Sequence, residues 1–318
     1  MRAYGLQSHI WNNTWKSGLL LAGFPILLLA LIYAVWVLII GAGGMAATPE
    51  EGLRLAAERM ATTWPFALLG AGVWFAIAWA FNQKMIEAAT GARGLTRKEA
   101  PDLYNMLENL SITAGRPMPK LAIIETPALN AFASGISDSS YTVTLTRGLI
   151  ETLDRDELEA VMAHELTHIQ NRDVRLLIIA IIFVGVFSFV GEILFRNFWR
   201  LGMRPRQPHR REDGRSQGLM ILIAVAIVAI AYALAVLIRF AISRSREYLA
   251  DAGAVELTKN PDAMISALQK ISGHSRLKAP ADVAQMFIDN DVKFMSLFAT
   301  HPPIEARVEA LRKFAGGR

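Results

Sequence analysis

Cysteine is absent from the 318 residues of this sequence. The chain therefore has no disulfide framework, no thiolate metal site and no cysteine nucleophile. Charged residues are also scarce, at 19%, whereas soluble proteins carry about a quarter. The net charge of +5 is small, and the basic residues cluster beside apolar segments. This pattern indicates membrane topology rather than nucleic-acid binding.

Apolar residues make up 53% of the chain and are concentrated in four runs. The runs are Gly18–Ile40, Pro65–Phe81, Val174–Phe195 and Gly218–Ile238. A membrane-spanning helix needs about 20 apolar residues. The first run exceeds the roughly 7–15 apolar residues of a cleaved signal peptide, and four runs are too many for core helices of a soluble protein this small. The sequence predicts an integral membrane protein with four apolar helices.

The remaining segments predict an α-rich domain with a small β-sheet. Asp154 followed by Glu157 is a capping box that would begin a helix through His168. Apolar spacing supplies the other elements: helices at 97–113, from 246, at 261–271 and after 303, and strands at 121–125, 130–133 and 141–146.

Four segments of the chain follow from these patterns. Residues 1–81 form an N-terminal membrane anchor with two transmembrane helices, and 82–173 form the first part of the α-rich domain. Residues 174–242 form a transmembrane or membrane-embedded helical hairpin, and 243–318 form the second part of the α-rich domain.

The string His164-Glu165-Leu166-Thr167-His168 carries the chemistry. Histidines four residues apart project from one face of a helix, so both imidazoles can bind the same zinc ion. Glu165, next to a ligand, is placed to act as the general base that takes a proton from the attacking water. The alternative is a polar helix with two surface histidines, but the flanking apolar residues favour a buried helix.

A catalytic zinc ion needs a third protein ligand. A third histidine at position 174 would complete one common motif, but that residue is Val174. Glu192 would lie roughly 27 Å along the third apolar run, which excludes it unless the run is broken. Glu247 follows the fourth run, and a helical hairpin would return it to the level of His168. Glu247 and Asp251 are four residues apart, so one can bind zinc while the other orients a ligand. Alternatively, both pair with Arg244 or Arg246 on a solvated face.

Four strings together resemble the HtpX-type membrane metalloproteases, relatives of the CAAX prenyl proteases within the gluzincins. They are His164–His168, Ser243–Asp251, Asn130–Ala133 and Thr300–Pro303. The resemblance implies zinc-dependent endoproteolysis with one zinc ion per chain, bound by His164, His168 and Glu247, with Asp251 supporting the site. It also implies a stress-response role in quality control of misfolded or damaged membrane proteins, in a bacterial inner membrane.

The resemblance further suggests that Asn130, Ala131, Phe132 and Ala133 form an edge strand above the zinc ion. An edge strand offers unpaired backbone groups, so a substrate peptide can add to it by β-augmentation. An ordinary turn is the alternative. His301 is a candidate donor to the oxyanion, although His-Pro-Pro is also a signal that starts a helix. Arg307 is a comparable candidate.

Charge asymmetry predicts the orientation in the membrane. Arg2 and Lys16 without nearby acids place the N-terminus inside, and two spans then return the catalytic domain to the cytoplasm. The arginine-rich loop at 196–215 conflicts with a hairpin that crosses fully, so either strong flanking helices carry it across or the hairpin does not span. Both ends of the hairpin lie on one side in either case. The sequence does not specify an oligomeric state.

Two other functions remain open at this stage. One is a site-specific protease of lipidated C-termini, which a comparison of prenylated peptide with denatured membrane protein would separate. The other is a non-catalytic zinc-bearing scaffold or transporter. A transporter is expected to carry ionisable residues within its spans and an internal repeat. Apart from Glu192 and Arg239 near their ends, the spans lack such residues, and the sequence shows no internal repeat.

Overall fold

The computed structural model describes residues 6–182, 185, 218–229, 244–275, 286–288 and 302–316. The chain divides into two compact units. One unit comprises residues 18–78 and 182–238, and we call it the apolar unit. The other comprises residues 1–17, 79–181 and 239–318, and we call it the catalytic unit.

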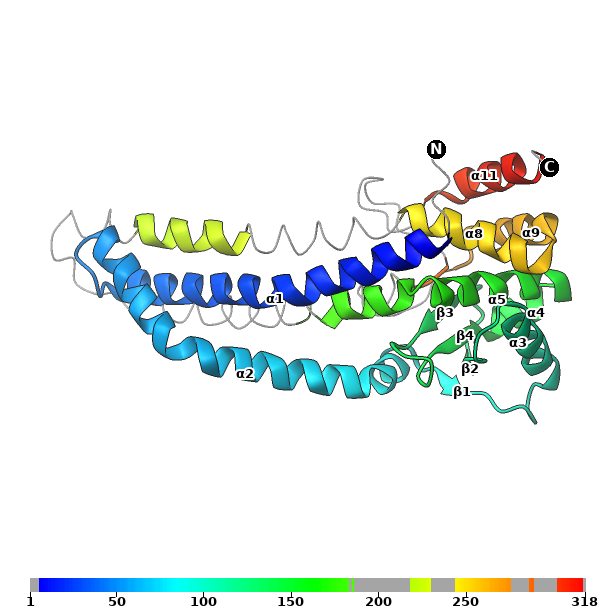
Figure 1. Cartoon of the computed structure of the whole chain (residues 1–318), viewed down its shortest axis with the longest axis horizontal. Coiled ribbons are helices and arrows are strands. Elements are labelled where there is room, and N and C mark those ends of the chain that lie inside the picture. Colours follow the sequence, from blue (N-terminus) through cyan, green and yellow to red (C-terminus); the bar gives the residue numbers. More distant parts are fainter. Residues whose placement is uncertain are drawn as a thin grey trace. The chain divides into compact units, whose positions relative to one another are not determined.

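The apolar unit is built on residues 18–43 and 49–78 of two long helices, α1 (Leu6–Gly43) and α2 (Pro49–Thr90) (Figure 1). Each contains an 18-residue window apolar enough to cross a membrane, with mean hydropathy of 2.7 within Ala22–Gly43 and 1.6 within α2. Large apolar side chains of α2 remain exposed, among them Phe66, Leu69 and Val73. Such a surface suits lipid rather than water.

Contacts within the apolar unit join the two helices to the short apolar helix Gly218–Ala229. Met220 packs into a cluster with Val37 and Ile40 of α1 and Ala56 of α2. The indole nitrogen of Trp36 donates to the Thr63 hydroxyl at 3.0 Å. This bond satisfies a polar group on each helix where water is scarce.

The four predicted runs are described to different extents. The first lies within α1, and the second is only the apolar part of α2, which contains Pro65 and continues to Thr90. The expected boundary at residue 82 therefore falls inside a helix. Of the third and fourth runs, residues 174–182 and 218–229 are helical, and most of the remainder lies outside the described residues. The described part of the chain thus contains two candidate spans, not four.

The catalytic unit contains a four-stranded mixed sheet in the order β1-β2-β4-β3. The strands are β1 (Arg93–Gly94), β2 (Lys120–Ile124), β3 (Ala131–Ser134) and β4 (Thr142–Thr146). β2 pairs parallel with β4, whereas β3 pairs antiparallel with β4, opposite Thr142–Leu145. The three predicted strands are thus present, within one residue of their expected bounds. In the pairing order β3 stands at one edge of the sheet.

Local signals explain where helices of this unit begin. The helices are α3 (Pro101–Thr113), α4 (Arg147–Thr152), α5 (Arg155–Gln170), α8 (Arg244–Thr258), α9 (Pro261–Ile271) and α11 (Ile304–Gly316). The capping box at the start of α5 is confirmed: Asp154 accepts from the Glu157 amide, and the Glu157 carboxylate accepts from the Asp154 amide. α3 begins at Pro101 rather than at residue 97, because proline is favoured in the first helical turn and disfavours helix before it.

Helices α5 and α8 pack along one another and bring together segments far apart in sequence (Figure 1). α9 packs on both of them, and α11 packs on α8 and α9. Residues Ala160–Thr167 of α5 are buried throughout. A helix enclosed on all sides holds its side chains in fixed rotamers, which suits a site that needs a fixed geometry.

Candidate metal centre

Two histidines on the buried helix α5 face one another across a single helical turn. The Nε2 atoms of His164 and His168 lie 3.1 Å apart, and the rings meet edge to face at 88°. His164 is completely buried, whereas 14% of the His168 side chain is exposed. Solvent therefore reaches the histidine pair from the side of His168.

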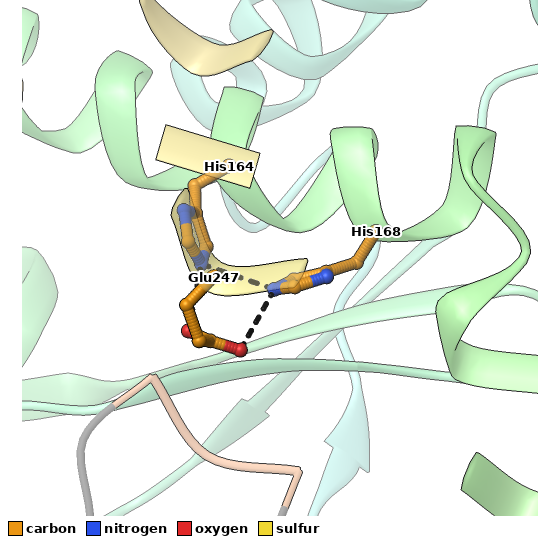
Figure 2. A group of neighbouring side chains, drawn as sticks. All are labelled: His164, His168 and Glu247. Carbon is orange, nitrogen blue, oxygen red and sulfur yellow. Dashed lines mark hydrogen bonds and ion pairs between the residues drawn. The ribbon is translucent and has the colours of Figure 1, made fainter. Parts of the chain in front are cut away.

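Glu247, in the first turn of α8, completes the group (Figure 2). Its carboxylate lies 3.8 Å from His164 Nε2 and 3.6 Å from His168 Nε2. One ligand atom from each of the three residues lies within 4.8 Å of the others, so the group could hold a metal ion. We call His164, His168 and Glu247 the metal cluster. Glu247 is buried, so the alternative in which it pairs with arginine on a solvated face is wrong.

The donor atoms of the cluster fit a metal ion. The Nδ1 atoms of both imidazoles already contact carboxylates, at 3.0 Å to Asp251 and 3.0 Å to Asp173. With each Nδ1 carrying a proton, both Nε2 lone pairs face one space, where they repel unless an electropositive centre lies between them. A tetrahedral ion with bonds of about 2.0–2.1 Å places its ligand atoms roughly 3.3 Å apart. The observed separations of 3.1–3.8 Å bracket that distance.

In the metal-free protein the pKa values of the two imidazoles are shifted in opposite directions. Burial lowers the pKa of His164 to about 4. Burial acts in the same direction on His168, but its hydrogen bond with Asp173 and the nearby carboxylate of Glu247 outweigh this effect and raise its pKa to about 9. His168 therefore carries the proton that lies between the two Nε2 atoms. A metal ion that binds both rings must displace it.

Glu165 lies between the cluster residues on α5 and is also buried. Burial raises its pKa to about 7, although the charge of His168 and a hydrogen bond from the Ala133 amide oppose the shift. A carboxyl group that titrates near neutral pH can both accept and return a proton, which is the property that a general base requires.

Asp251 and Arg307 form a buried ion pair behind His164. Arg307 donates to Asp251 through Nε at 2.9 Å and Nη2 at 2.6 Å, a two-pronged geometry. Its Nη1 atom donates to the Ile288 carbonyl at 3.0 Å and lies 3.5 Å from Glu247. Arg307 thus contacts one member of the metal cluster, Glu247, and Asp251, the carboxylate behind His164. His301, the other candidate oxyanion donor, lies outside the described residues.

Asp173 and Arg246 occupy the corresponding position behind His168, and the sequence reasoning missed both in this role. Asp173 accepts from His168 Nδ1, and Arg246 Nη1 lies 3.7 Å from the Asp173 carboxylate and 3.3 Å from its backbone carbonyl. Both residues are buried. The only signal in the sequence was the position of these two charged residues near the ends of the hairpin at 174–242, Asp173 directly before it and Arg246 four residues after it.

The strand β3, predicted as a substrate edge, lies near the cluster but is already engaged at its first residue. The amide of Ile288 donates to the Ala131 carbonyl at 2.9 Å and lies 3.1 Å from Asn130 Oδ1. Phe287 packs on Phe132 with ring centroids 5.4 Å apart. Residues 286–288 therefore lie along this edge, and Ala133 further along the strand donates to Glu165.

Comparison with known proteins agrees with this geometry. Residues 97–315 match the model of peptidase family M48. The match covers more than half of the chain, which belongs to this family and is a metalloprotease.

The particular branch of the family follows from individual relatives. The chain is 44% identical to a protease HtpX homolog of Bacteroides fragilis, over 99% of this chain and 100% of the relative. It is 35% identical to a protease HtpX homolog of Streptococcus pneumoniae, over 97% and 99%. The crystal structure of S. mikatae Ste24p aligns with a TM-score of 0.48 and 20% identity, over 78% of this chain and 58% of that chain. With its two apolar helices, the chain is an HtpX-type membrane metalloprotease.

Proposed function

We propose that this protein is a zinc-dependent endopeptidase whose single metal ion is held by His164, His168 and Glu247. The convergence of these side chains, one carboxylate and two Nε2 atoms at 3.1–3.8 Å, carries the proposal. Imidazole with one carboxylate favours zinc over magnesium or calcium, which prefer oxygen ligands. When bound, the metal would supply Lewis acidity, which activates water and polarises the peptide carbonyl.

Glu165 acts as the general base in this proposal. It lies on the same helix as both histidines and is buried, so its carboxylate holds a fixed position. It takes a proton from water as the water attacks the carbonyl carbon, and then delivers that proton to the leaving nitrogen. The pKa of about 7 suits both transfers. Asp251 and Arg307 hold His164 in orientation from behind.

The substrate binds as an extended strand along β3. Backbone pairing recognises main chain rather than side chains, which suits a protease that removes many misfolded or damaged membrane proteins. Because Ile288 already donates to the Ala131 carbonyl, a substrate strand that pairs along all of β3 must displace residues 286–288. Pairing along the strand itself requires a substrate chain in an extended conformation.

The catalytic unit faces the cytoplasm of a bacterium, with the chain crossing the inner membrane several times. Basic residues at the membrane-proximal ends of the catalytic segments support this orientation, among them Lys84, Arg172, Arg175 and Arg244. The chain is divided into an anchor (residues 1–81), two catalytic parts (82–173 and 243–318) and a helical hairpin (174–242), with α2 running from the anchor into the first catalytic part.

Two variants of the detergent-purified full chain test the mechanism. Glu165→Gln should retain one equivalent of zinc and lose about 10²-fold or more of its activity on casein, because the general base is removed while the ligands remain. Glu247→Ala should lose the metal. Full activity in the first variant, or full zinc in the second, would contradict the assignment. Assaying a prenylated peptide beside casein separates a broad endopeptidase from a protease of lipidated C-termini.

A further inference from the structure

The hydrogen bond between His168 and Asp173 depends on a break in the helix. On an uninterrupted α-helix, residues five positions apart lie about 140° apart around the axis, so their side chains do not meet. Here α5 ends at Gln170, and Arg172 adopts a left-handed conformation with φ of 59°. This turn redirects the chain, and Asp173 returns to within 3.0 Å of His168 Nδ1.

The partner of Asp173 comes from a distant segment. Arg246 stands immediately before Glu247 in α8, and its guanidinium lies against both the carboxylate and the backbone carbonyl of Asp173. Only 9% of the Arg246 side chain and 3% of the Asp173 side chain are exposed. The pair therefore joins the segment that carries His168 to the segment that carries Glu247, one residue away from Glu247.

We propose that Asp173 and Arg246 are positioning residues for the metal cluster. Asp173 holds the proton of His168 on Nδ1, which directs the Nε2 lone pair at the metal. Arg246 holds Asp173 in place and fixes the start of α8, so that Glu247 meets the two imidazoles. The arrangement repeats the one behind His164, where Asp251 and Arg307 take the same places. This inference rests on the proposed ligand set of His164, His168 and Glu247.

The competing explanation is that the pair only stabilises the fold. The chain offers a matched control for that explanation. Glu157 of α5 is also a buried carboxylate paired with a cation on another helix, Lys270 of α9, at 2.6 Å. Its recorded partners, Asp154, Ser266 and Lys270, lie outside the metal cluster. Loss of this pair should lower stability without changing metal affinity.

The test measures metal affinity, not activity, on the full-length chain in detergent after removal of metal. Zinc dissociation constants come from competition with a chromophoric chelator, and the absorption spectrum of bound Co²⁺ reports the ligand geometry. After correction for the protonation of His168, which Asp173 itself favours, Asp173→Asn should bind zinc about 10- to 100-fold more weakly, the usual effect of removing the partner of a ligating imidazole. Arg246→Met should act in the same direction, and Glu157→Gln should bind like wild type.

Conservative variants keep the test decisive if Asp173→Asn does not fold. Arg246→Lys preserves the charge beside Asp173 and should bind zinc within about threefold of wild type, whereas Arg246→Met should not. Equal affinities of wild type, Asp173→Asn and Arg246→Met would overturn the proposal, and so would an equal loss in Glu157→Gln. If Glu247→Ala loses the metal while these variants keep it, the ligand set stands and only the positioning role fails.

Discussion

Gly253 of α8 lies directly against Thr167 of α5. A Cβ atom at Gly253 would overlap the methyl group of Thr167 and lie 2.8 Å from its hydroxyl oxygen. Thr167 is next to His168, and Gly253 is six residues after Glu247, so this close approach sets the distance between the two helices that carry the metal cluster.

Substituting Gly253 with alanine should therefore force α8 away from α5. We expect Gly253→Ala to lose about 1–3 kcal/mol of stability, as overpacking usually does, and to bind zinc more weakly. Thermal unfolding in detergent and chelator competition measure the two effects. Thr167→Ala removes the atoms in the way, so the double variant should recover much of both losses. If the losses of the two single variants simply add in the double variant, the contact between Gly253 and Thr167 does not set the distance between α5 and α8.

Metal affinity should depend on pH through His168. Its pKa is about 9 in the metal-free protein, so at neutral pH the ring is protonated and must release a proton when the metal binds. The apparent association constant should rise about tenfold per pH unit up to pH 9 and then level off. Chelator competition between pH 6.5 and about 8.5 tests the slope, and a pH-independent constant would contradict it. One proton released per metal, measured in weakly buffered solution, provides a second check.

The capping residue Glu157 should contribute to stability in a pH-dependent way. Burial raises its pKa, but hydrogen bonds from Lys270 and Ser266 outweigh burial, and the net pKa is lowered from 4.5. A lowered pKa means that the stabilisation is present above about pH 4.5 and is lost as pH falls through the folded-state value. Because 40% of the Lys270 side chain is exposed, we expect Glu157→Gln to cost only about 1–2 kcal/mol at pH 7.

The measurement is the unfolding midpoint of both proteins from pH 7 down to pH 4, where their difference should shrink. Glu309→Gln is the matched control, because Glu309 pairs with Lys313 on an exposed helix face. Its unfolding midpoint should stay close to that of wild type at every pH, because exposed ion pairs contribute little to stability. A constant difference between wild type and Glu157→Gln across this range would show that the negative charge of Glu157 does not contribute to stability.

Residues 286–288 should leave the edge of β3 when a substrate binds. The chain has no cysteine, so a single introduced cysteine reports on its own position. Met286 is buried, and Met286→Cys in the Glu165→Gln background should react slowly with a maleimide. A saturating unfolded peptide should accelerate the reaction, whereas an exposed control, Ser139→Cys, should react at the same rate with and without peptide. Continued protection of position 286 would mean that these residues are a permanent part of the edge.

Much of the catalytic unit was predictable because its signals are local. The spacing of His164 and His168, the capping box at Asp154 and the bounds of α9 each depend on neighbours within one or two helical turns. In α9, Asn260 caps the first turn by accepting from the Ala263 amide. The length of α2 was not predictable from hydropathy, because hydropathy detects only its apolar part and the helix continues through polar residues at both ends.

The support of the cluster was predicted only in part. Asp251 was expected behind a ligand because it lies four residues after Glu247. The role of Asp173 was not predicted, because Asp173 reaches His168 only where Arg172 adopts a left-handed conformation. An arginine in the sequence does not predict that conformation, which non-glycine residues rarely adopt. Arg307 was expected near the substrate, and its recorded contacts are with Asp251, Glu247 and Ile288.

The sequence by itself determined the residue types that can bind a metal, the helical spacing that aligns two of them and the apolar helices beside them. These follow from short-range periodicity and composition, which any segment carries in isolation. Only the tertiary structure decided that Glu247 meets both imidazoles, that each imidazole has its own carboxylate and arginine, and that Ile288 lies on the edge of β3. Those contacts join segments from opposite ends of the catalytic unit, and they exist only because buried helices pack at distances fixed by residues such as Gly253.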